Sequence, residues 1–517
     1  MNNTTQQETV AVAPAPPKAT RKDWWGLAVI ALPCVLYSMD LTVLNLAVPQ
    51  LSASLKPSST QLLWIMDIYG FLVAGFLITM GTLGDRIGRR KLLMIGAAFF
   101  GAASILAAFA GTAGMLIAAR AILGIAGATL APSTLSLIRN MFLDPQQRTM
   151  AIGVWAASYS AGGAIGPLIG GLMLEHFWWG SVFLLAIPVM ILLLVLGPVL
   201  LPEFKDPKAG KLDLFSALLS LIAVLSIIYG LKQIASEGFG WLPLAFIIAG
   251  IVIGILFLKR QGKLNDPLID IRLFKIPAFS ASLLIYGMGC FVMFGSFFFT
   301  FQYLQLVLGL SPIKAGLWSL PSFAGFMIGA MLGPFFLRYL SPGRFMAGSL
   351  LLAAVGFVIL TQLTPNSNIG TVIAALLCFS LGFAPVVTMA TDLIIGAAPP
   401  ERAGAAGALS ETSAEFGGAL GMAILGSVGT ALYRSKMINT IPEGVPTDVA
   451  EQAQQTLGSA VAEASQLSGN AGAALLDAAH NAFVLGLQVA AMASVGIILI
   501  LAILAAVRLG KVQPAKH

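Results

Sequence analysis

The sequence predicts an all-α integral membrane protein with fourteen transmembrane helices. Of its 517 residues, 58% are hydrophobic and 10% are charged, whereas about a quarter of the residues of a soluble domain are charged. A helix needs about 20 apolar residues to cross the hydrocarbon layer, and the chain contains many such runs. The runs are continuous rather than alternating, which argues against a β-barrel. Because backbone groups in lipid must be satisfied within their own segment, the runs are predicted to be helices.

Fourteen apolar runs are long enough to span a bilayer. We place them near residues 26–49, 61–83, 92–110, 114–137, 150–174, 182–201, 213–233, 241–258, 278–308, 314–337, 345–363, 370–397, 404–433 and 482–508. An even number of spans puts both termini on the same side of the membrane.

Lysine and arginine are distributed unevenly between alternate loops. With a cytoplasmic amino terminus, 23 of the 29 lie on the inner side, five lie on the outer side, and Arg120 lies within a span. Cytoplasmic loops carry this kind of excess, so both termini are predicted to be cytoplasmic. A missed span would reverse the later loops and remove the bias. The net charge of +7 is therefore an orientation signal, and nothing in it favours a nucleic-acid partner.

The order of the spans suggests two six-helix halves. Short basic Gly-Arg turns follow the second span, at 84–89, and the tenth, at 337–344, and repeated halves are common in transporters. The predicted organisation is a disordered cytoplasmic tail (1–23), an N-terminal six-helix bundle (24–204), two additional transmembrane helices (205–260), a C-terminal six-helix bundle (261–509) with an extracellular hairpin loop (434–481), and a cytoplasmic tail (510–517).

The segment 434–481 is the one long outer loop. Pro446, followed by Asp448 and by Glu451 three residues later, resembles a capping signal ahead of an Ala/Gln-rich helix. The glycines of 469–472 are expected to end that helix before a second short one. We interpret the segment as a solvated extracellular hairpin. The alternative is a vestibule that modulates substrate access.

Six ionisable residues fall within or at the edges of the spans: Asp40, Asp67, Arg120, Asp392, Glu411 and Glu415. An ionisable side chain at mid-bilayer costs at least about 2.5–3.5 kcal/mol, so each is expected to face the bundle interior or a wet cavity. Asp392, close to Arg402, is interpreted as structural. The other acids are interpreted as functional, with Asp67 closer to the water than Asp40.

Glu411 and Glu415 lie one turn apart on the same helical face. Two carboxylates so close together in a low dielectric cannot easily both ionise, so one is expected to bind and release a proton near neutral pH. A proton or a cationic substrate could neutralise such a group, but not comfortably both. Competition for one negative charge is the minimal mechanism of antiport.

No metal, cofactor or enzymatic site is predicted. Three cysteines and three histidines occur, and they form no metal-ligand or catalytic pattern. A phosphate-binding loop of the Gly-x4-Gly-Lys-Ser/Thr type is not visible, so we expect the proton gradient, rather than ATP, to be the energy source.

Three motifs resemble those of the major facilitator superfamily. Residues 81–91 look like the loop between its second and third helices, which implies that Asp85, Arg86, Gly88 and Arg89 govern the inward gate. The pattern around Arg120 is similar to the fourth helix, whose arginine is linked to proton transfer. The run 162–171, with Gly166, Pro167 and Gly170, resembles the fifth helix of its antiporters. Its small residues permit close helix approach, and its proline permits a bend.

Further motifs are similar to the fourteen-helix drug:proton antiporters of that superfamily, and especially to quaternary-ammonium-compound efflux pumps. They are residues 39–49, 63–69, 392–404 and 410–417. The resemblance covers nearly all of the chain after residue 24. It implies a major facilitator fold and assigns Asp40, Asp67, Arg120, Glu411 and Glu415 to proton coupling or cation binding. Span ten lacks the acid that some members use for divalent cations, which puts recognition of bulky dications in doubt.

Lipophilic cations need a negative charge and aromatic faces. The candidate aromatic contacts are Trp64, Tyr69, Tyr159 and Phe294. The predicted function is proton-coupled export of lipophilic cations across the bacterial cytoplasmic (inner) membrane by a monomer in contact with membrane lipids. The alternatives are an exporter of a natural metabolite (an amino acid, lipid or siderophore) on the same scaffold, and a non-transporting membrane receptor. A proton-coupled importer is disfavoured by the fifth-helix pattern.

Overall fold

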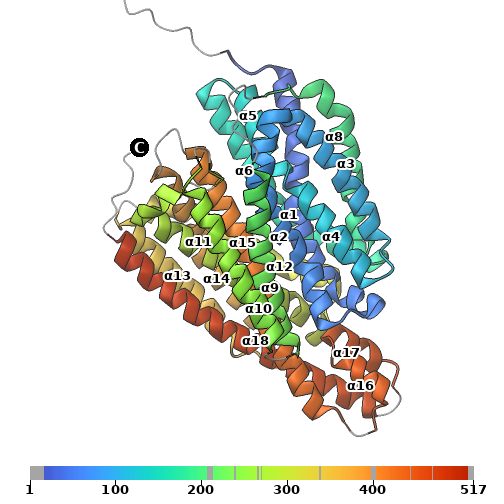
Figure 1. Ribbon diagram of the computed structural model, residues 1–517. Helices are drawn as coiled ribbons and strands as arrows, with labels where there is room; N and C mark the ends of the chain where they lie inside the picture. The colour runs from blue at the N-terminus through green and yellow to red at the C-terminus, as the bar shows by residue number, and fades with distance from the viewer. Residues whose placement is uncertain are drawn as a thin grey trace, which may run out of the picture.

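The chain folds as a bundle of long helices (Figure 1). The computed structural model describes residues 17–205, 213–237, 240–264, 267–268, 271–336, 339–397, 403–442, 444–467 and 470–510, and within them it contains helices but no strands. Most of both predicted tails lies outside these residues. The all-α fold class is confirmed.

The first group of helices comprises α1 (Arg21–Leu55), α2 (Ser59–Ile87), α3 (Arg89–Ala108), α4 (Ala113–Gly127), α5 (Leu130–Met141), α6 (Pro145–His176), α7 (Ser181–Leu184) and α8 (Ala186–Leu200). Two helices follow, α9 (Leu214–Glu237) and α10 (Trp241–Gln261).

The second group comprises η1 (Ile271–Lys275), α11 (Pro277–Gln302) with its π-helical extension η2 (Tyr303–Val307), α12 (Pro312–Phe336), α13 (Pro342–Leu360), α14 (Ile369–Gly396), α15 (Ala403–Thr440), α16 (Thr447–Ala453), α17 (Leu457–Ala464), and α18 (Asn470–Leu504) with its extension η4 (Ala505–Leu509).

Twelve helical segments of the described chain are long and apolar enough to cross a membrane, or thirteen when the bent α1 counts as one span. Helix α12, with 25 residues, occupies the place of the tenth predicted span but is not among them. The chain is therefore a multi-pass membrane protein, while the number fourteen stays a prediction.

Several helix starts follow directly from the local sequence. Thr20 and Asp23 form a capping box at α1, and Ser58 and Gln61 form another at α2. The side chain of Asp144 accepts a hydrogen bond from the backbone N–H of Gln147 at the start of α6. These side chains satisfy N–H groups that the first turn of a helix leaves without partners, and so they fix where each span begins.

The two groups meet at one end of the bundle and diverge at the other (Figure 1). We call the end that carries α16 and α17 the hairpin end, and the end that carries Thr20 and Gly510 the tail end. On α2 and α15, Leu63 packs against Gly426 and Gly70 packs against Ala419. These contacts lie in the half of α2 nearer the hairpin end. The bundle is therefore closed at that end.

Helices α6 and α12 form a second contact between the groups, and glycines make it close. A Cβ atom at Gly171 would lie 2.7 Å from the Cα atom of Ile313, and one at Gly316 would overlap the carbonyl oxygen of Pro167. The glycine-rich run expected to permit close helix approach does so here, because small residues let two backbones touch.

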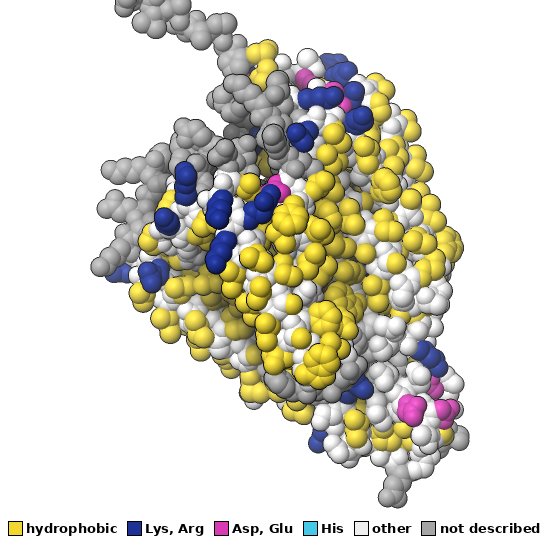
Figure 2. Space-filling model, in the orientation of Figure 1, with side chains coloured by type: hydrophobic (Ala, Val, Ile, Leu, Met, Phe, Trp, Pro, Cys, Tyr) yellow, Lys and Arg dark blue, Asp and Glu magenta, His cyan; other side chains and the backbone are white. Residues whose placement is uncertain are grey.

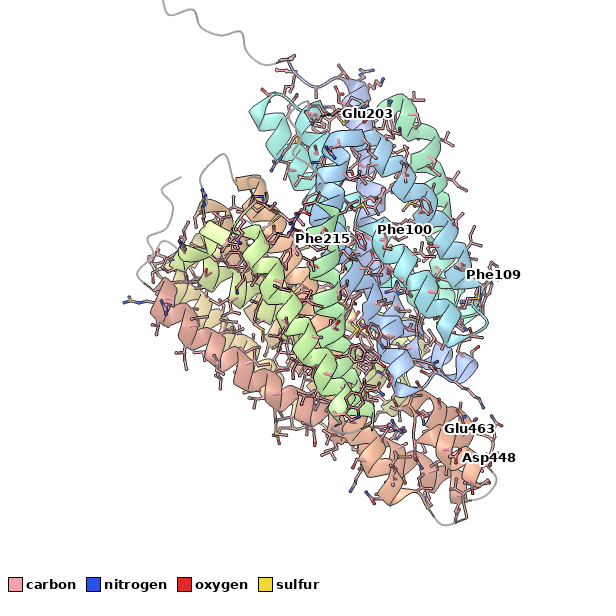
Figure 3. All side chains as sticks on the ribbon, in the orientation of Figure 1. Phe100, Phe109, Glu203, Phe215, Asp448 and Glu463 are labelled. Atoms are coloured by element: carbon pink, nitrogen blue, oxygen red, sulfur yellow. The ribbon has the colours of Figure 1, made fainter. Side chains whose placement is uncertain are left out.

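The hairpin forms a bridge from the second group to the first. Lys56, after α1, is paired with Glu463 of α17 at 2.6 Å, and the hydroxyl of Ser59 donates to the carbonyl oxygen of Gln455 at 2.5 Å. Figure 3 labels Glu463 at this end and Glu203 at the other.

The hairpin contains two short helices, as expected, but they are separated at Gln454–Thr456, where the side chain of Thr456 caps α17. The expected break near 469–472 falls where α17 has ended at Ala464 and α18 begins at Asn470. The helix after the break is α18, which runs on into the span, and not a separate short helix.

Helices α9 and α10 pack on each other, and an ion pair between two side chains joins them at the tail end. The guanidinium of Arg260 donates two hydrogen bonds to Asp213 at 3.1 Å, and Ser216 also donates to this carboxylate. Although desolvation acts to raise it, the pKa of Asp213 is lowered by the hydrogen bonds from Ser216 and by Arg260. The pair therefore stays ionised at neutral pH.

A disulfide across the hairpin end is expected to stop transport. A Cβ atom at Gly458 would lie 2.7 Å from the Cβ atom of Ser52, close enough for a bridge after a small shift. The variant with Ser52→Cys and Gly458→Cys is expected to crosslink spontaneously and to lose transport in vesicles, because α17 can then no longer leave α1. Reduction should restore transport, and each single variant is the control. Unimpaired transport by the crosslinked protein would contradict this.

Candidate functional site

A bend in α1 places Asp40. The segments Arg21–Asp40 and Thr42–Leu55 meet at an angle of 43°. No proline stands at the bend, but the hydroxyl of Thr42 donates a hydrogen bond to the carbonyl oxygen of Met39 at 3.0 Å. A threonine that bonds back to its own helix in this way often bends it. The bend therefore originates in the Asp40-Leu41-Thr42 sequence itself.

Asp40 forms a buried ion pair with Arg120 of α4. Nη1 of Arg120 lies 2.5 Å from Oδ2 of Asp40, and only 1% of the Arg120 residue surface is exposed. Nε of Arg120 donates to the carbonyl oxygen of Ile65 at 3.2 Å, and the guanidinium lies 4.6 Å from the ring centre of Tyr69. A cation without water needs such partners, and the aromatic face adds a cation–π contact.

Glycines of α4 allow this arrangement. A Cβ atom at Gly124 would lie 2.7 Å from the carbonyl oxygen of Tyr69, and one at Gly127 would lie 3.0 Å from its hydroxyl oxygen. Larger residues would push α2 away and remove Tyr69 from Arg120. A cavity of about 20 Å³ adjoins Asp40 between α1, α3, α7 and α8, which is enough room for about one water molecule. The paired carboxylate of Asp40 therefore borders a small space in the first group.

Asp67 and Asp392 occupy opposite environments. Asp67 is 1% exposed within α2, so it faces the interior of the bundle, as expected of an ionisable residue in a span. Its depth relative to Asp40 stays a prediction. Position 67 lies deep in the half of α2 that α15 covers. The side chain of Asp392 is exposed near the tail end of α14, and Arg402, its predicted partner, lies outside the described residues.

Glu411 and Glu415 lie on the face of α15 that turns away from α11. Ser413 and Gly417 face α11, since a Cβ atom at Gly417 would overlap the backbone of Gly287 and the hydroxyl of Ser413 donates to Leu283. The Glu411 side chain is exposed, yet it interacts electrostatically with Tyr159 of α6 and Tyr286 of α11. It therefore faces the space between the two groups rather than lipid.

Tyr37 links the two carboxylate sites. Its hydroxyl donates a hydrogen bond of 2.7 Å to Oε1 of Glu415, which crosses from the first group to the second. Its ring lies 6.0 Å from that of Tyr69, which in turn packs on Arg120. Tyr37 did not emerge from the sequence analysis. Its position three residues before Asp40, which puts both on one helical face, was the available signal.

The four candidate aromatic residues do not line a single binding site. Tyr159 packs on Tyr37 and Trp155 at ring distances of 5.7 and 4.9 Å, beside Glu415. Phe294 packs against Gly418 of α15, close to the same site. Tyr69 is enclosed beneath Arg120, and Trp64 packs against α9 at the outside of the bundle. Tyr159 and Phe294 are thus the two that border the carboxylates.

The predicted gate is a tight turn between α2 and α3. Gly88 has φ +114°, which disfavours other residues. Arg86 is exposed, whereas Arg89 is buried and donates to the carbonyl oxygen of Pro132 at 3.3 Å. The side chain of Asp85 lies outside the described part of the chain. Its predicted role as a gate stays a prediction.

Glu203 holds this turn in place, which the sequence analysis missed. Its carboxylate accepts hydrogen bonds from the backbone N–H groups of Arg90 and Lys91 at 3.1 and 3.2 Å. An anion at a helix amino terminus is favoured by the helix dipole and by the unpaired N–H groups there. The turn is therefore fixed to the end of α8.

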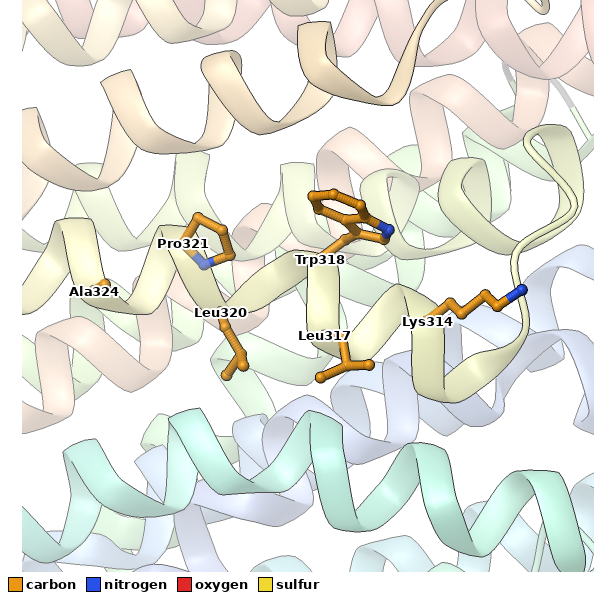
Figure 4. Close-up of a pocket in the computed structure, with 6 residues that line it drawn as sticks. All are labelled: Lys314, Leu317, Trp318, Leu320, Pro321 and Ala324. Atoms are coloured by element: carbon orange, nitrogen blue, oxygen red, sulfur yellow. The ribbon is translucent and has the colours of Figure 1, made fainter.

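A groove runs along α12. It has a volume of about 490 Å³ and is lined by Lys314, Leu317, Trp318, Leu320, Pro321 and Ala324, all on one helix (Figure 4). Its lining residues include no carboxylate. We therefore do not assign cation binding to it.

The two groups of membrane helices meet at one end, and carboxylates lie between and within them. This arrangement is typical of membrane transporters. The family model of the Major Facilitator Superfamily matches residues 30–422, and the chain belongs to this superfamily. It is a transporter rather than an enzyme.

Two relatives match over nearly their full length. The multidrug efflux pump LfrA of Mycolicibacterium smegmatis is 42% identical over 486 residues, covering 94% of this chain and 96% of LfrA. The methyl viologen resistance protein SmvA of Salmonella typhimurium is 36% identical over 490 residues, covering 93% and 97%. The resemblance to multidrug efflux members is thus confirmed.

A solved structure shares the fold. The bacterial homolog of the human lysosomal transporter Spinster, described as inward-facing and unoccupied, has a TM-score of 0.63 and 18% identity. The match covers 96% of this chain and 100% of that one.

Removal of the Arg120 guanidinium is expected to destabilise the protein strongly. Arg120→Ala leaves the Asp40 carboxylate buried without its partner, which costs about 3–5 kcal/mol. Adding Asp40→Asn should recover part of the loss, because the two residues are coupled. Thermal unfolding of the purified variants measures both effects. Additive losses in the double variant would contradict the ion pair.

Loss of the Tyr37 hydroxyl is expected to lower the melting temperature. Tyr37→Phe keeps the ring contacts but removes a hydrogen bond to a carboxylate, a kind of bond that contributes about 1.5–3 kcal/mol. Tyr69→Phe is the matched control, because the Tyr69 hydroxyl has no hydrogen-bond partner among the described residues. Equal melting temperatures for the two variants would count against the cross-group bond.

Proposed function

We propose that this transporter is a proton-coupled antiporter that exports lipophilic cations, such as quaternary ammonium antiseptics and dyes, across the bacterial cytoplasmic membrane. One observation carries the proposal. Glu411 and Glu415 border the space between the two groups, beside Tyr159 and Phe294. A negative charge with aromatic neighbours suits an organic cation.

The Asp40–Arg120 pair supports coupling to protons. It lies within the first group, apart from Glu411, and has its own small cavity. A proton that neutralises Asp40 would weaken its hold on Arg120. The guanidinium would then rely on Ile65 and Tyr69 alone. Protonation in one group can thus change the packing next to Tyr37, which donates a hydrogen bond to Glu415 of the other group.

The membrane potential favours this exchange. Moving one elementary charge across the membrane is worth about 2.3 kcal/mol per 100 mV. An exporter that carries one monovalent cation outward gains from that potential only if more than one proton returns. The chain has two separate carboxylate sites, one at Asp40 and one at Glu411 with Glu415. Together they can bind more than one proton.

We take the tail end as the cytoplasmic side. The basic side chains gather at that end of the molecule (Figure 2), as the distribution of lysine and arginine in the sequence predicts. On this assignment the described conformation is closed toward the outside and open toward the cytoplasm, which is the state that loads an exported substrate. Both termini then lie in the cytoplasm.

The names of the relatives support an exporter of drugs. LfrA is named a multidrug efflux pump and SmvA a methyl viologen resistance protein. Recognition of dications stays open: α12 contains no acidic residue, whereas methyl viologen, in the name of SmvA, is a dication. Export of a natural metabolite is the remaining alternative, and competition between that metabolite and a dye would reveal it.

The first test follows protons directly. Inside-out vesicles with an acid interior receive ethidium, and the internal pH is recorded against vesicles without the protein. Substrate-dependent loss of internal protons supports antiport. Uptake of ethidium without proton release would leave a potential-driven exporter, and the buried acids would then serve the substrate or the structure.

Asp40→Asn and Glu411→Gln are expected to abolish proton release in this assay while the protein stays in the membrane. Each amide keeps the shape of the side chain but cannot exchange a proton. Asp392→Asn is the matched control, since that carboxylate is exposed near the tail end. Normal coupling in both test variants would refute the carboxylate mechanism.

A further inference from the structure

Three elements of the second group form a groove at the hairpin end, with a volume of about 570 Å³. We call it the α15/α18 groove. The loop between α13 and α14, the last turn of α15 and the first half of α18 contribute its lining. The residues that carry the argument are Thr364 of the loop, Lys436 and Thr440 of α15, and Asn481, Leu485 and Gln488 of α18.

Hydrogen bonds hold the loop in place against the helices. The hydroxyl of Tyr303 donates to the carbonyl oxygen of Thr364 at 2.5 Å, and Nε2 of Gln488 donates to that of Leu363 at 2.8 Å. A loop fixed at two consecutive carbonyl groups keeps its shape. The α15/α18 groove is therefore a formed feature of the second group.

Polar and apolar lining residues lie at different depths in the membrane. Lys436 and Thr440 follow the span predicted at 404–433, and Asn481 directly precedes the span predicted at 482–508. Leu485 and Gln488, by contrast, lie within that last span. The groove therefore crosses the boundary between the headgroups and the hydrocarbon of the leaflet at the hairpin end.

The apolar end of the groove continues along α18. Leu485, Met492 and Leu499 are exposed, and their spacing of seven residues puts them on one helical face. Gly496 lies on the same face, and a Cβ atom there would have no neighbour within 4 Å. The surface therefore has a shallow depression that an extended hydrocarbon chain can follow toward the tail end.

The polar end carries one cation and no carboxylate among its lining residues. The ammonium group of Lys436 forms no ion pair with the part of the chain that the structure describes. Asp477, the one acid of α18, stands a turn before Asn481 and outside the lining. Lysine binds phosphate as a point charge, so Lys436 suits a phosphate group.

Asn481 can supply a second donor to the same group. Its side-chain nitrogen donates one hydrogen bond to the carbonyl oxygen of Asp477 at 2.8 Å, and an amide has two N–H groups. The Thr440 hydroxyl already donates to the carbonyl oxygen of Lys436. Lys436 and Asn481 are therefore the donors that remain at the headgroup end.

We propose that the α15/α18 groove binds a glycerophospholipid of the leaflet at the hairpin end, with its phosphate at Lys436 and Asn481 and one acyl chain along α18. A soluble anion would use Lys436 but would leave the apolar half of the groove empty. Under the orientation proposed above, this leaflet is the outer one. The site itself depends neither on that orientation nor on the transported substrate.

Protection of an introduced cysteine tests the site. Asn481→Cys places a thiol in the groove, and Asn439→Cys is the matched control. Both asparagines are exposed at the hairpin end, and each donates to the carbonyl oxygen four residues earlier in its own helix, but Asn439 does not line the groove. Each purified variant in detergent reacts with N-ethylmaleimide. The wild-type protein measures the reaction of the native cysteines.

Three additives separate the parts of the ligand. Dioleoylphosphatidylglycerol is expected to slow the reaction at 481 about tenfold and to leave the reaction at 439 unchanged. Dioleoylglycerol, which has the same chains without the phosphate, and sodium phosphate, which has no chains, should each protect neither position. Protection by sodium phosphate alone would make the groove a site for a soluble anion and would overturn the proposal.

Two further variants test the role of Lys436 in the Asn481→Cys protein. Lys436→Gln should remove the protection by dioleoylphosphatidylglycerol, whereas Lys436→Arg, which keeps the positive charge, should retain it. Equal reaction rates at 481 with and without the lipid, or equal slowing at 439, would refute the site. Equal protection by dioleoylglycerol, or full protection in Lys436→Gln, would refute recognition of the phosphate.

Discussion

The hydrocarbon core of a membrane does not solvate charge, and this constraint determines where the few charged side chains of the bundle lie. Arg120 is 1% exposed and is held by Asp40, by the carbonyl oxygen of Ile65 and by the ring of Tyr69. All three partners must stay within reach, because removal of any one leaves the guanidinium short of a contact that water would otherwise supply. The relative positions of α1, α2 and α4 follow from this requirement.

Glycine makes those positions possible. Gly124 and Gly127 bring α2 against α4 inside the first group, and Gly287 and Gly417 do the same for α11 and α15 in the second. Between the groups, Gly171 and Gly316 join α6 to α12. The contacts within a group keep its helices together, whereas the contact of α6 with α12 joins the two groups. Each group can move as a unit when the contacts between the groups separate, which is how many transporters alternate access.

Much of the fold could be predicted from the sequence, because composition and charge bias act over whole spans. The all-α class, the position of Arg120 within a span and the shared face of Glu411 and Glu415 were all predictable from spacing. The sequence did not show that α15 covers the part of α2 that carries Asp67, because this contact spans more than 300 residues of sequence. Glu203 and Tyr37 were missed for the same reason, since each acts on an element distant in the chain.

The hydrogen bond between Tyr37 and Glu415 has a consequence for any exchange of partners at this site. Its donor belongs to the first group and its acceptor to the second, so it cannot survive a rotation that separates the two groups at that depth. A cation that neutralises Glu415 removes the charge that strengthens the bond, and so does a proton. Either ligand therefore loosens the same cross-group contact, while the empty carboxylate keeps it. Under the proposed function, an unloaded transporter is thus held in one conformation by its own buried charge, and loading is what releases it.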